Sequence, residues 1–198
     1  MYLRRKVDKY LREWYDNPDH KPLIVKGARQ VGKTESIIKF AEANYDNVIY
    51  INFALDKKYC VITEDGYTVE AVNKAISRID PSKSFVQEKT LIFFDEIQDH
   101  PDIATTLKSY CIDGRYDVIC SGSLLGLYYK KIESNSVGYK TDYTMRSLDF
   151  EEFLWAKGYD DELKSDLFKA MQDGVPMSPS LMQVMSEAFL DYVIVGGM

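Results

Sequence analysis

The residues from Gly27 to Thr34 have the types and the spacing of a phosphate-binding loop. They read Gly-Ala-Arg-Gln-Val-Gly-Lys-Thr and match the Walker A pattern G-x-x-x-x-G-K-[ST] at every fixed position. A short apolar run at residues 22–26 precedes the loop and a stretch with helical spacing, residues 35–44, follows it. Backbone N–H groups at such a strand–loop–helix junction surround phosphate oxygens, and small residues allow a close approach. We therefore expect phosphate to contact Gly27, Ala28, Arg29, Gln30, Val31, Gly32, Lys33, Thr34 and Glu35.

Two side chains of the loop are expected to act on the bound nucleotide. The Lys33 ammonium can reach the β- and γ-phosphates and stabilise their charge during catalysis. The Thr34 hydroxyl can hold Mg²⁺, which prefers oxygen ligands. The loop therefore predicts binding of a magnesium–nucleotide complex.

An apolar run that ends in two acids supplies the second element of the predicted site. Residues 91–96 read Leu-Ile-Phe-Phe-Asp-Glu, which is typical of a Walker B strand buried on both faces of a parallel sheet. Asp95 would emerge at the carboxyl end of this strand, beside the phosphate loop, and orient Mg²⁺ through water. The adjoining Glu96 would polarise the attacking water, although an acid at this position can also simply cap the next turn.

A polar segment at the end of the next predicted strand supplies the third element. Ser121-Gly122-Ser123 ends the strand that begins at Tyr116. In sheets of this kind, the strand between the two motif strands brings a polar side chain near the γ-phosphate. Either Ser121 or Ser123 could have this sensing role, and an ordinary small-residue turn remains the simpler alternative.

The sequence around these motifs favours ATP over GTP. A strand at residues 48–53 lies between the two motif strands in sequence, which fits the ATPases that have an additional central strand. The chain lacks an Asn-Lys-x-Asp guanine motif, because Asn73-Lys74-Ala75-Ile76 has no final acid. Asp95 is also not followed by the glycine of an Asp-x-x-Gly switch. We therefore predict ATP and Mg²⁺ as the ligands.

Alternating strand and helix patterns over residues 21–147 predict the fold that positions these motifs. We expect an α/β P-loop NTPase with a mostly parallel five-stranded sheet between helices and a short C-terminal helical extension. The predicted domains are the ATPase domain, residues 1–158 with an N-terminal amphipathic helix, and the helical extension, residues 159–198. Strands are expected at residues 22–26, 48–53, 90–96, 116–121 and 143–145, and helices at residues 2–15, 35–44, 68–79, 101–113, a short stretch to 129, 149–157, 160–171 and 181–195.

The bulk composition fits one domain with a small appendage. The chain has 198 residues, of which 45% are apolar and 28% charged. Its net charge of −6 gives the surface no general attraction to nucleic acid. DNA binding would need a local basic patch, for which the candidates are Arg4, Arg5, Lys6 and Arg12, and a solvated helix face is the simpler interpretation of these charges.

The cysteines and the N-terminus indicate a cytoplasmic protein. Cys60, Cys111 and Cys120 are odd in number and lack metal-site spacing, which fits reduced thiols. No segment approaches the roughly 18 apolar residues of a membrane span. Charged residues continue from Arg4 to Glu13, where a signal peptide would have its apolar region. We therefore expect no membrane partner.

Several motifs occur in an order that resembles a prokaryotic family of AAA+-like P-loop ATPases, and the resemblance covers nearly the whole chain. Besides residues 5–14 and the phosphate loop, they are Asp95-Glu96-Ile97-Gln98, Ser121-Gly122-Ser123, Phe150-Glu151-Glu152-Phe153-Leu154 and Val195-Gly196-Gly197-Met198. The resemblance implies an AAA+-like ATPase that uses ATP and Mg²⁺.

Two positions depart from the family pattern. Gly138-Tyr139-Lys140 stands where the family often has Gly-Arg, an arginine that would contact the phosphate of a neighbouring subunit. Ser147 stands where a proline usually precedes the Phe-Glu-Glu-Phe helix. We therefore keep a homo-oligomer as one expectation, although the sequence offers no identified arginine finger for it.

Family members usually continue into a C-terminal region of unknown function with winged-helix and sometimes nuclease-like features. The chain ends at Met198, just after an apolar helix and a glycine pair, at the point that leads into this region. We therefore expect an ATPase fragment that lacks a C-terminal domain and whose last helix exposes an apolar face. A complete small protein is the alternative.

Three functions remain compatible with the sequence. The leading one is hydrolysis of ATP with Mg²⁺ in an unknown process. The alternative is a nucleotide-dependent switch or DNA-associated regulatory module with little hydrolysis, which the missing arginine finger favours. A P-loop kinase is a third option, but the loop at residues 130–140 that would form its lid contains no arginine.

Overall fold

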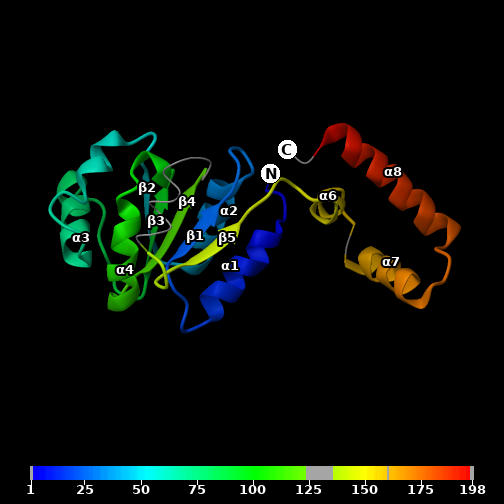
Figure 1. The fold of residues 1–198 in the computed structure, drawn as a ribbon, viewed down its shortest axis with the longest axis horizontal. Coiled ribbons are helices and arrows are strands. Elements are labelled where there is room, and N and C mark those ends of the chain that lie inside the picture. The colour runs from blue at the N-terminus through cyan, green and yellow to red at the C-terminus, as the bar shows by residue number, and fades with distance from the viewer. Residues whose placement is uncertain (1, 124–135, 160, 197–198) are drawn as a thin grey trace. The chain divides into compact units, whose positions relative to one another are not determined.

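A parallel β-sheet forms the core of the unit at residues 11–145 in the computed structural model, which describes residues 2–123, 136–159 and 161–196 (Figure 1). Its five strands lie in the order β2-β3-β4-β1-β5, and all neighbours pair in parallel. β4 therefore lies between the phosphate-loop strand β1 and the acid-bearing strand β3. The predicted α/β fold is confirmed. The strands are β1 (Leu23–Lys26), β2 (Asn47–Asn52), β3 (Thr90–Asp95), β4 (Asp117–Gly122) and β5 (Thr141–Thr144).

Helices connect the strands and follow the last of them. The expected short helix to Tyr129 and most of the polar loop after it lie outside the described residues. The α-helices are α1 (Lys6–Asp16), α2 (Lys33–Asn44), α3 (Val69–Ile79), α4 (Ile103–Asp113), α6 (Phe150–Ala156), α7 (Asp161–Asp173) and α8 (Pro179–Val195), with short 3₁₀ helices η1 (Lys57–Val61) and η2 (Ile97–Asp99).

The start of α1 differs from the prediction, which placed it at residue 2. The helix begins at Lys6, and side chains accept hydrogen bonds from the backbone N–H groups at this end. The Arg5 N–H donates to Asp8 Oδ2 at 2.8 Å, and the Lys6 N–H donates to Glu152 Oε1 at 2.7 Å. One local side chain, Asp8, and one distant in sequence, Glu152, therefore lie at this helix end, whereas apolar periodicity alone would extend the helix.

Apolar side chains fill the two faces of the sheet. α3 and α4 cover one face and α2 covers the other (Figure 1). Burial of this kind supplies the main driving force for folding and holds the strand ends in place. The cluster on the α3–α4 side contains Ile24, Ile49, Ile51, Ile92, Phe94, Val118 and Cys120 from the strands and Val72, Ile76, Ala104 and Leu107 from the helices.

The pleat of the strands gathers polar side chains on the α2 side. Phe93 on β3 pairs in register with Ile119 on β4. Because residues two positions apart share a face of a strand, Asp95 and Ser121 follow these two residues on the same face. Asn52 on β2 pairs directly with Asp95. The carboxyl ends of three neighbouring strands thus bring polar groups together.

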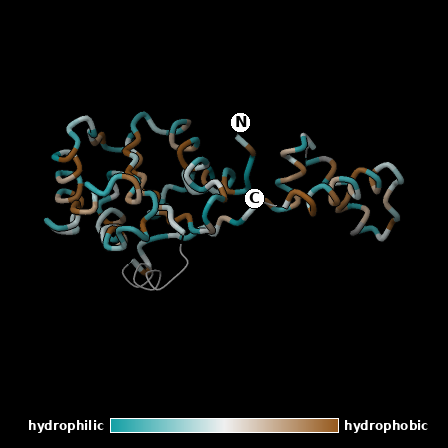
Figure 2. The backbone as a smooth tube through the Cα atoms, turned by 90° about the horizontal axis from the view of Figure 1, so that it is seen from above, coloured by the Kyte–Doolittle hydropathy of each residue, from teal (hydrophilic) through white to brown (hydrophobic). Residues whose placement is uncertain are grey.

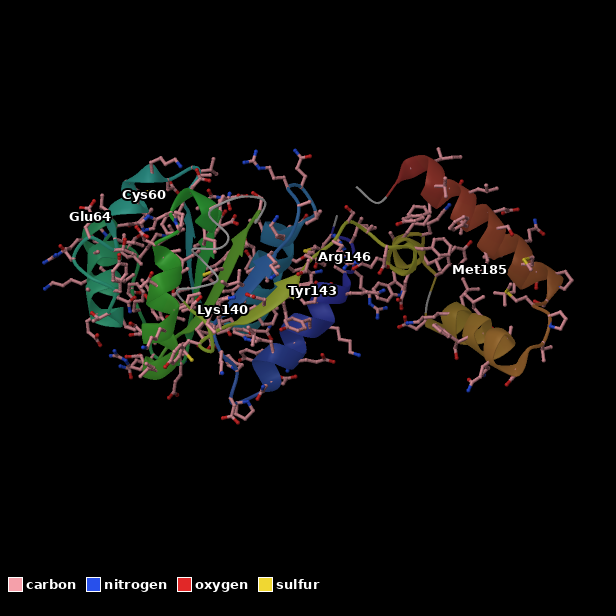
Figure 3. All side chains as sticks on the ribbon, viewed as in Figure 1. Cys60, Glu64, Lys140, Tyr143, Arg146 and Met185 are labelled. Atoms are coloured by element: carbon pink, nitrogen blue, oxygen red, sulfur yellow. The ribbon has the colours of Figure 1, made fainter. Side chains whose placement is uncertain are left out.

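The chain divides into two compact units, residues 11–145 and residues 1–10 with 146–198. In the second unit, Arg5 Nε lies 3.2 Å from Glu152 Oε1, and both side chains are buried. Arg5 Nη2 also donates to the carbonyl O of Arg146, a residue labelled in Figure 3, at 2.7 Å. The predicted domain boundary at residue 158 stays a prediction.

The last two helices of the second unit, α7 and α8, differ from their predicted bounds by one or two residues at three of their four ends, whereas α6 begins at its predicted cap. Asp149 and Glu152 form the predicted capping box at the start of α6. Hydrophobic residues recur along the C-terminal helices (Figure 2), and α8 leaves several of them exposed, among them Phe189, Leu190, Val193 and Ile194. Among the described residues, no helix combines the length and the apolar character needed to cross a membrane.

Candidate nucleotide site

The phosphate loop leaves β1 through a backbone path that requires glycine. A Cβ on Gly27 would lie 2.1 Å from the carbonyl O of Met145, the residue after β5. The Met145 N–H donates to the Lys26 carbonyl at 2.7 Å, so hydrogen bonding holds the two segments close together. Gly32, the N-cap of α2, has a φ of 91°, and Gln30 has a φ of 64°. The loop therefore curves to the N-terminus of α2, where the helix dipole favours anions.

Lys33 is the buried cation of this loop. Its side chain is 5% exposed, and its Nζ donates to the carbonyl O of Ala28 at 2.6 Å and of Gly27 at 3.1 Å. Burial lowers the pKa of Lys33, and the nearby carboxylates of Glu96 and Asp95 oppose that shift. The ammonium is thus held by neutral carbonyl groups, which a phosphate can replace without the loss of an ion pair.

Half of the other residues of the predicted loop are exposed. Val31 is buried, at 4% exposure, and anchors the loop in the apolar interior. Burial is the main cause of the lowered pKa of Lys33, and the positive charge of Arg29 lowers it further. The two cations are therefore close enough to interact. The exposed members are Ala28, Arg29, Gln30 and Glu35.

Asp95 is the centre of a hydrogen-bond network at the end of β3. The residue is 1% exposed. Its Oδ2 accepts a hydrogen bond from the Thr34 hydroxyl at 2.9 Å. The same oxygen accepts from the Tyr50 hydroxyl and from Asn52 Nδ2, both at 3.1 Å. The structure therefore places the two predicted metal ligands, Thr34 and Asp95, in direct contact.

The second oxygen of this carboxylate contacts the end of β4. The hydroxyl of Ser121, which is fully buried, donates to Asp95 Oδ1. The backbone N–H of Glu96 donates to the same atom at 3.0 Å. Ser123 instead contributes its backbone N–H, which donates to Gln98 Oε1 at 3.1 Å. The two serines that the sequence left as alternatives thus have different positions, with the Ser121 side chain at the carboxylate.

Tyr50 and Asn52 are site residues that the sequence analysis did not single out. Asn52 Oδ1 accepts hydrogen bonds from the backbone N–H groups of Ala54 and Leu55, both at 3.0 Å. Because these two groups can only donate, the amide nitrogen of Asn52 must face Asp95. The sequence signal that could have identified them is their spacing. Tyr50 and Asn52 are polar, lie two positions apart in an otherwise apolar strand, and therefore share one face of the sheet.

Glu96 follows Asp95 in a left-handed backbone conformation. Its φ and ψ are 55° and 47°, which costs a residue with a side chain about 1 kcal/mol. The residue is half-buried, and one carboxylate oxygen accepts a hydrogen bond from the side-chain amide of Gln98. The surrounding hydrogen bonds therefore stabilise a turn that places a second acid directly after the strand.

The donor set of Thr34 and Asp95 fits Mg²⁺. Both side chains offer oxygen, the ligand that this hard cation prefers, and phosphate oxygens and water would complete its coordination. All groups that donate to Asp95 are neutral hydroxyls, amides or a backbone N–H. None of the ion pairs in the described part of the chain includes Asp95, so its charge is available to a cation.

The sheet order, the phosphate loop and the acid-bearing strand together define a P-loop nucleotide-binding domain of the additional-strand type. Residues 19–154 match the model of a family described as AAA domain. Because this match spans more than half of the chain, the chain belongs to the AAA domain family. Its function is therefore of the nucleotide-binding, ATPase-like kind. No curated protein matches the chain.

Solved structures are similar to the chain at low sequence identity, and the one with a TM-score above 0.5 shares its fold. Drosophila ORC bound to DNA has a TM-score of 0.52 and 12% identity, over 94% of this chain and 54% of that chain. PCH-2 of C. elegans has a TM-score of 0.45 and 13% identity, over 90% of this chain and 51% of that chain. The ADP form of Aeropyrum pernix ORC2 has a TM-score of 0.48 and 12% identity, over 93% and 68%. The chain thus spans about half the length of two of these structures.

Proposed function

We propose that the chain binds ATP with Mg²⁺ and hydrolyses it. The observation that carries this proposal is the meeting of Thr34 and Ser121 on the buried carboxylate of Asp95, at the end of the phosphate loop. The three residues come from α2, β4 and β3. Convergence of this kind, beside a glycine-containing loop that leads into the N-terminus of α2, supports a metal–phosphate site.

The loop and its two polar side chains would bind the nucleotide. Backbone N–H groups of residues 27–34 would contact the phosphates, and Lys33 would add a positive charge. Thr34 and Asp95 would hold Mg²⁺, which neutralises phosphate charge when bound. The missing Asn-Lys-x-Asp motif supports ATP over GTP.

Glu96 is the proposed general base. Its carboxylate would take a proton from the attacking water while the water oxygen bonds to the γ-phosphorus and the bond to the β–γ bridging oxygen breaks. The electron pair of that bond remains on ADP. Ser121 would respond to the γ-phosphate, because its hydroxyl already contacts the carboxylate of the proposed metal site.

Steady-state release of phosphate from Mg-ATP tests this function. The wild-type chain should turn over, and Glu96→Gln should lower kcat by roughly 100-fold or more while the ATP dissociation constant changes less than about three-fold. Glu42→Gln is the matched control, because Glu42 is exposed on α2. Turnover by Glu96→Gln at the wild-type rate would remove Glu96 from the role of base.

A nucleotide-dependent switch, or a DNA-associated regulatory module with little hydrolysis, is the second candidate. Lys140, the cation of the segment where the family often has an arginine, forms an ion pair with Asp142 at 2.6 Å. ATP binding without turnover at any protein concentration would favour this candidate. Turnover that rises with protein concentration would instead favour a catalytic homo-oligomer. A cytoplasmic location fits either function, since the cysteines are free thiols.

A further inference from the structure

The side chain of Gln98, in η2, joins the proposed base to the neighbouring strand. Its Nε2 donates to a carboxylate oxygen of Glu96. Its Oε1 accepts from the backbone N–H of Ser123, just after β4, at 3.1 Å. Nε2 also lies 3.3 Å from Asp99 Oδ2. One half-buried amide therefore connects the turn after β3 with the end of β4.

The chemistry of these contacts fixes the orientation of the amide. A backbone N–H can only donate, so the Gln98 atom that faces Ser123 must be the oxygen. An ionised carboxylate can only accept, so the atom that faces Glu96 must be the NH₂ group. A flipped amide would lose both hydrogen bonds, and the bridge therefore has one stable arrangement.

Gly122 provides the space for this bridge. A Cβ at this position would lie 2.7 Å from Gln98 Oε1 and 3.3 Å from Ile97 Cγ1. The three residues at the end of β4 thus have separate contacts. Ser121 donates from its hydroxyl to the carboxylate of the proposed metal site, Gly122 leaves room, and Ser123 donates from its backbone to Gln98.

We propose that Gln98 is a positioning residue that orients the Glu96 carboxylate and ties its placement to the end of β4. This inference rests on the proposed ATP hydrolysis, in which Glu96 is the base. A displacement of about 1 Å can reduce the rate of a positioned reaction by 100-fold, so a held carboxylate differs in effect from a free one. Any shift of the segment around Ser121 would pass through Gln98 to Glu96.

Replacement of one atom of the bridge separates positioning from simple structural support. Gln98→Glu keeps the side-chain length and the acceptor for Ser123, but it replaces the donor to Glu96 by a negative charge. We expect kcat to fall by roughly 10-fold or more and KM to change less than about two-fold. Gln183→Glu is the matched control, because Gln183 is exposed on α8 and donates to Glu187 at 3.0 Å.

Gly122→Ala reaches the same bridge from the other side. The new Cβ would meet the far end of a flexible side chain, so we expect the variant to fold and to displace Gln98. Its kcat should therefore fall about as far as that of Gln98→Glu. A wild-type kcat in Gln98→Glu would overturn the positioning role of Gln98 but not the proposed ATPase function. A wild-type chain without turnover would overturn the proposed ATPase function, and with it the role of Gln98 in hydrolysis.

NMR of the nucleotide-free protein tests the bridge without turnover. Glu96→Ala should shift the side-chain amide signals of Gln98. Gln98→Ala should speed hydrogen exchange of the Ser123 amide by roughly 10-fold, whereas Gln98→Glu should leave that amide protected. Gln98 signals that do not respond to Glu96→Ala, or a Ser123 amide that does not respond to Gln98→Ala, would overturn the proposal whatever the kinetics show.

Discussion

Two aspartates on neighbouring strands are hydrogen-bonded at opposite ends of the sheet, and only one of them is paired with a cation. Asp95 ends β3 and is 1% exposed, and its hydrogen-bond donors among the described residues are all neutral. Asp117 begins β4, and its side chain is 27% exposed. Its Oδ1 lies 2.8 Å from His20 Nε2, and its Oδ2 accepts from the Tyr45 hydroxyl at 2.6 Å.

The hydrogen bonds of His20 favour its positively charged form. Its Nδ1 lies 2.7 Å from the carbonyl O of Asn17, and its Nε2 faces the Asp117 carboxylate. Because both partners are acceptors, both ring nitrogens must carry protons. The hydrogen bond to Asp117 accordingly raises the pKa of His20.

The difference between these carboxylates lies in the charge of their donors. His20 forms an ion pair with Asp117 when its ring is protonated, so this contact ties the approach to β1 to the start of β4 as a structural link. The described donors to Asp95 carry no charge and fix the orientation of its carboxylate, which suits a ligand for a cation. Burial and the number of hydrogen bonds alone would not separate the two roles.

The largest effect should come from Lys33, compared with Lys21 as its control. The ammonium group of each lysine contacts a backbone carbonyl, at opposite ends of the sheet. Lys33 Nζ donates to Ala28, and Lys21 Nζ donates to Gly138 at 2.8 Å. Lys33→Met should weaken ATP binding by roughly 100-fold, because it removes a charged donor to phosphate. Lys21→Met should change it less than about two-fold. Titration of a fluorescent ATP analogue measures both, and equal affinities of the two variants would break the comparison.

A second prediction concerns the asparagine that orients Asp95. Asn52→Ala removes the donor to Asp95 and leaves the N–H groups of Ala54 and Leu55 without their acceptor. We expect the free energy of unfolding to fall by about 2 kcal/mol and kcat to fall several-fold. Urea unfolding and phosphate release measure the two effects.

The control for Asn52→Ala lies at the other end of the sheet. Asn17→Ala removes the side-chain acceptor for the Asp19 N–H, which is 3.0 Å from it. It should cost less than about 1 kcal/mol and leave kcat unchanged. A loss of turnover in Asn17→Ala would show that stability, rather than the position of Asp95, controls activity.

Each aspartate accepts a hydrogen bond from one tyrosine hydroxyl, Asp95 from Tyr50 and Asp117 from Tyr45. Replacing each tyrosine by phenylalanine removes that one hydrogen bond. Burial raises the pKa of Tyr50, so its hydroxyl stays protonated as a donor to Asp95. Tyr50→Phe and Tyr45→Phe should each lower the free energy of unfolding by roughly 1 kcal/mol. Only Tyr50→Phe should lower kcat, by about two- to five-fold. Equal effects of both variants on kcat would contradict the assignment of the two ends.

The smallest effect should be a pH dependence at Asp117. The pKa of His20 is raised above its usual 6.5, so the stabilisation is fully present below that pH and is lost as the pH rises through the folded-state pKa. Relative to His20→Asn, the wild type should therefore lose roughly 1 kcal/mol of unfolding free energy between about pH 6 and pH 9. A difference that stays constant over this range in urea unfolding would exclude a charged His20.

The sequence predicted the parts of the site that lie close together along the chain. The loop from Gly27 to Thr34 and the strand ending at Asp95 have local patterns, and their βα context predicted the sheet. The network around Asp95 was not predictable in the same way. Asn52 reaches Asp95 only because β2 and β3 pair in one particular register. A shift of one residue would move it to the other face.

The choice between the two serines depended on where a strand ends. In a continuous strand, Ser121 and Ser123 would share a face, so the pattern alone could not separate them. β4 ends at Gly122, and Ser123 therefore leaves the strand and turns its backbone toward Gln98. The link between His20 and Asp117 was likewise missed, because 97 residues separate the partners.

The most direct test of the comparison is the turnover of Mg-ATP by Asp95→Asn beside Asp117→Asn. Each variant removes one negative charge and nearly keeps the shape of the side chain. Asp95→Asn should lower kcat by roughly 100-fold or more, whereas Asp117→Asn should stay within about two-fold of the wild type and lose stability instead. Wild-type turnover in Asp95→Asn, or an equal loss in both variants, would contradict the account.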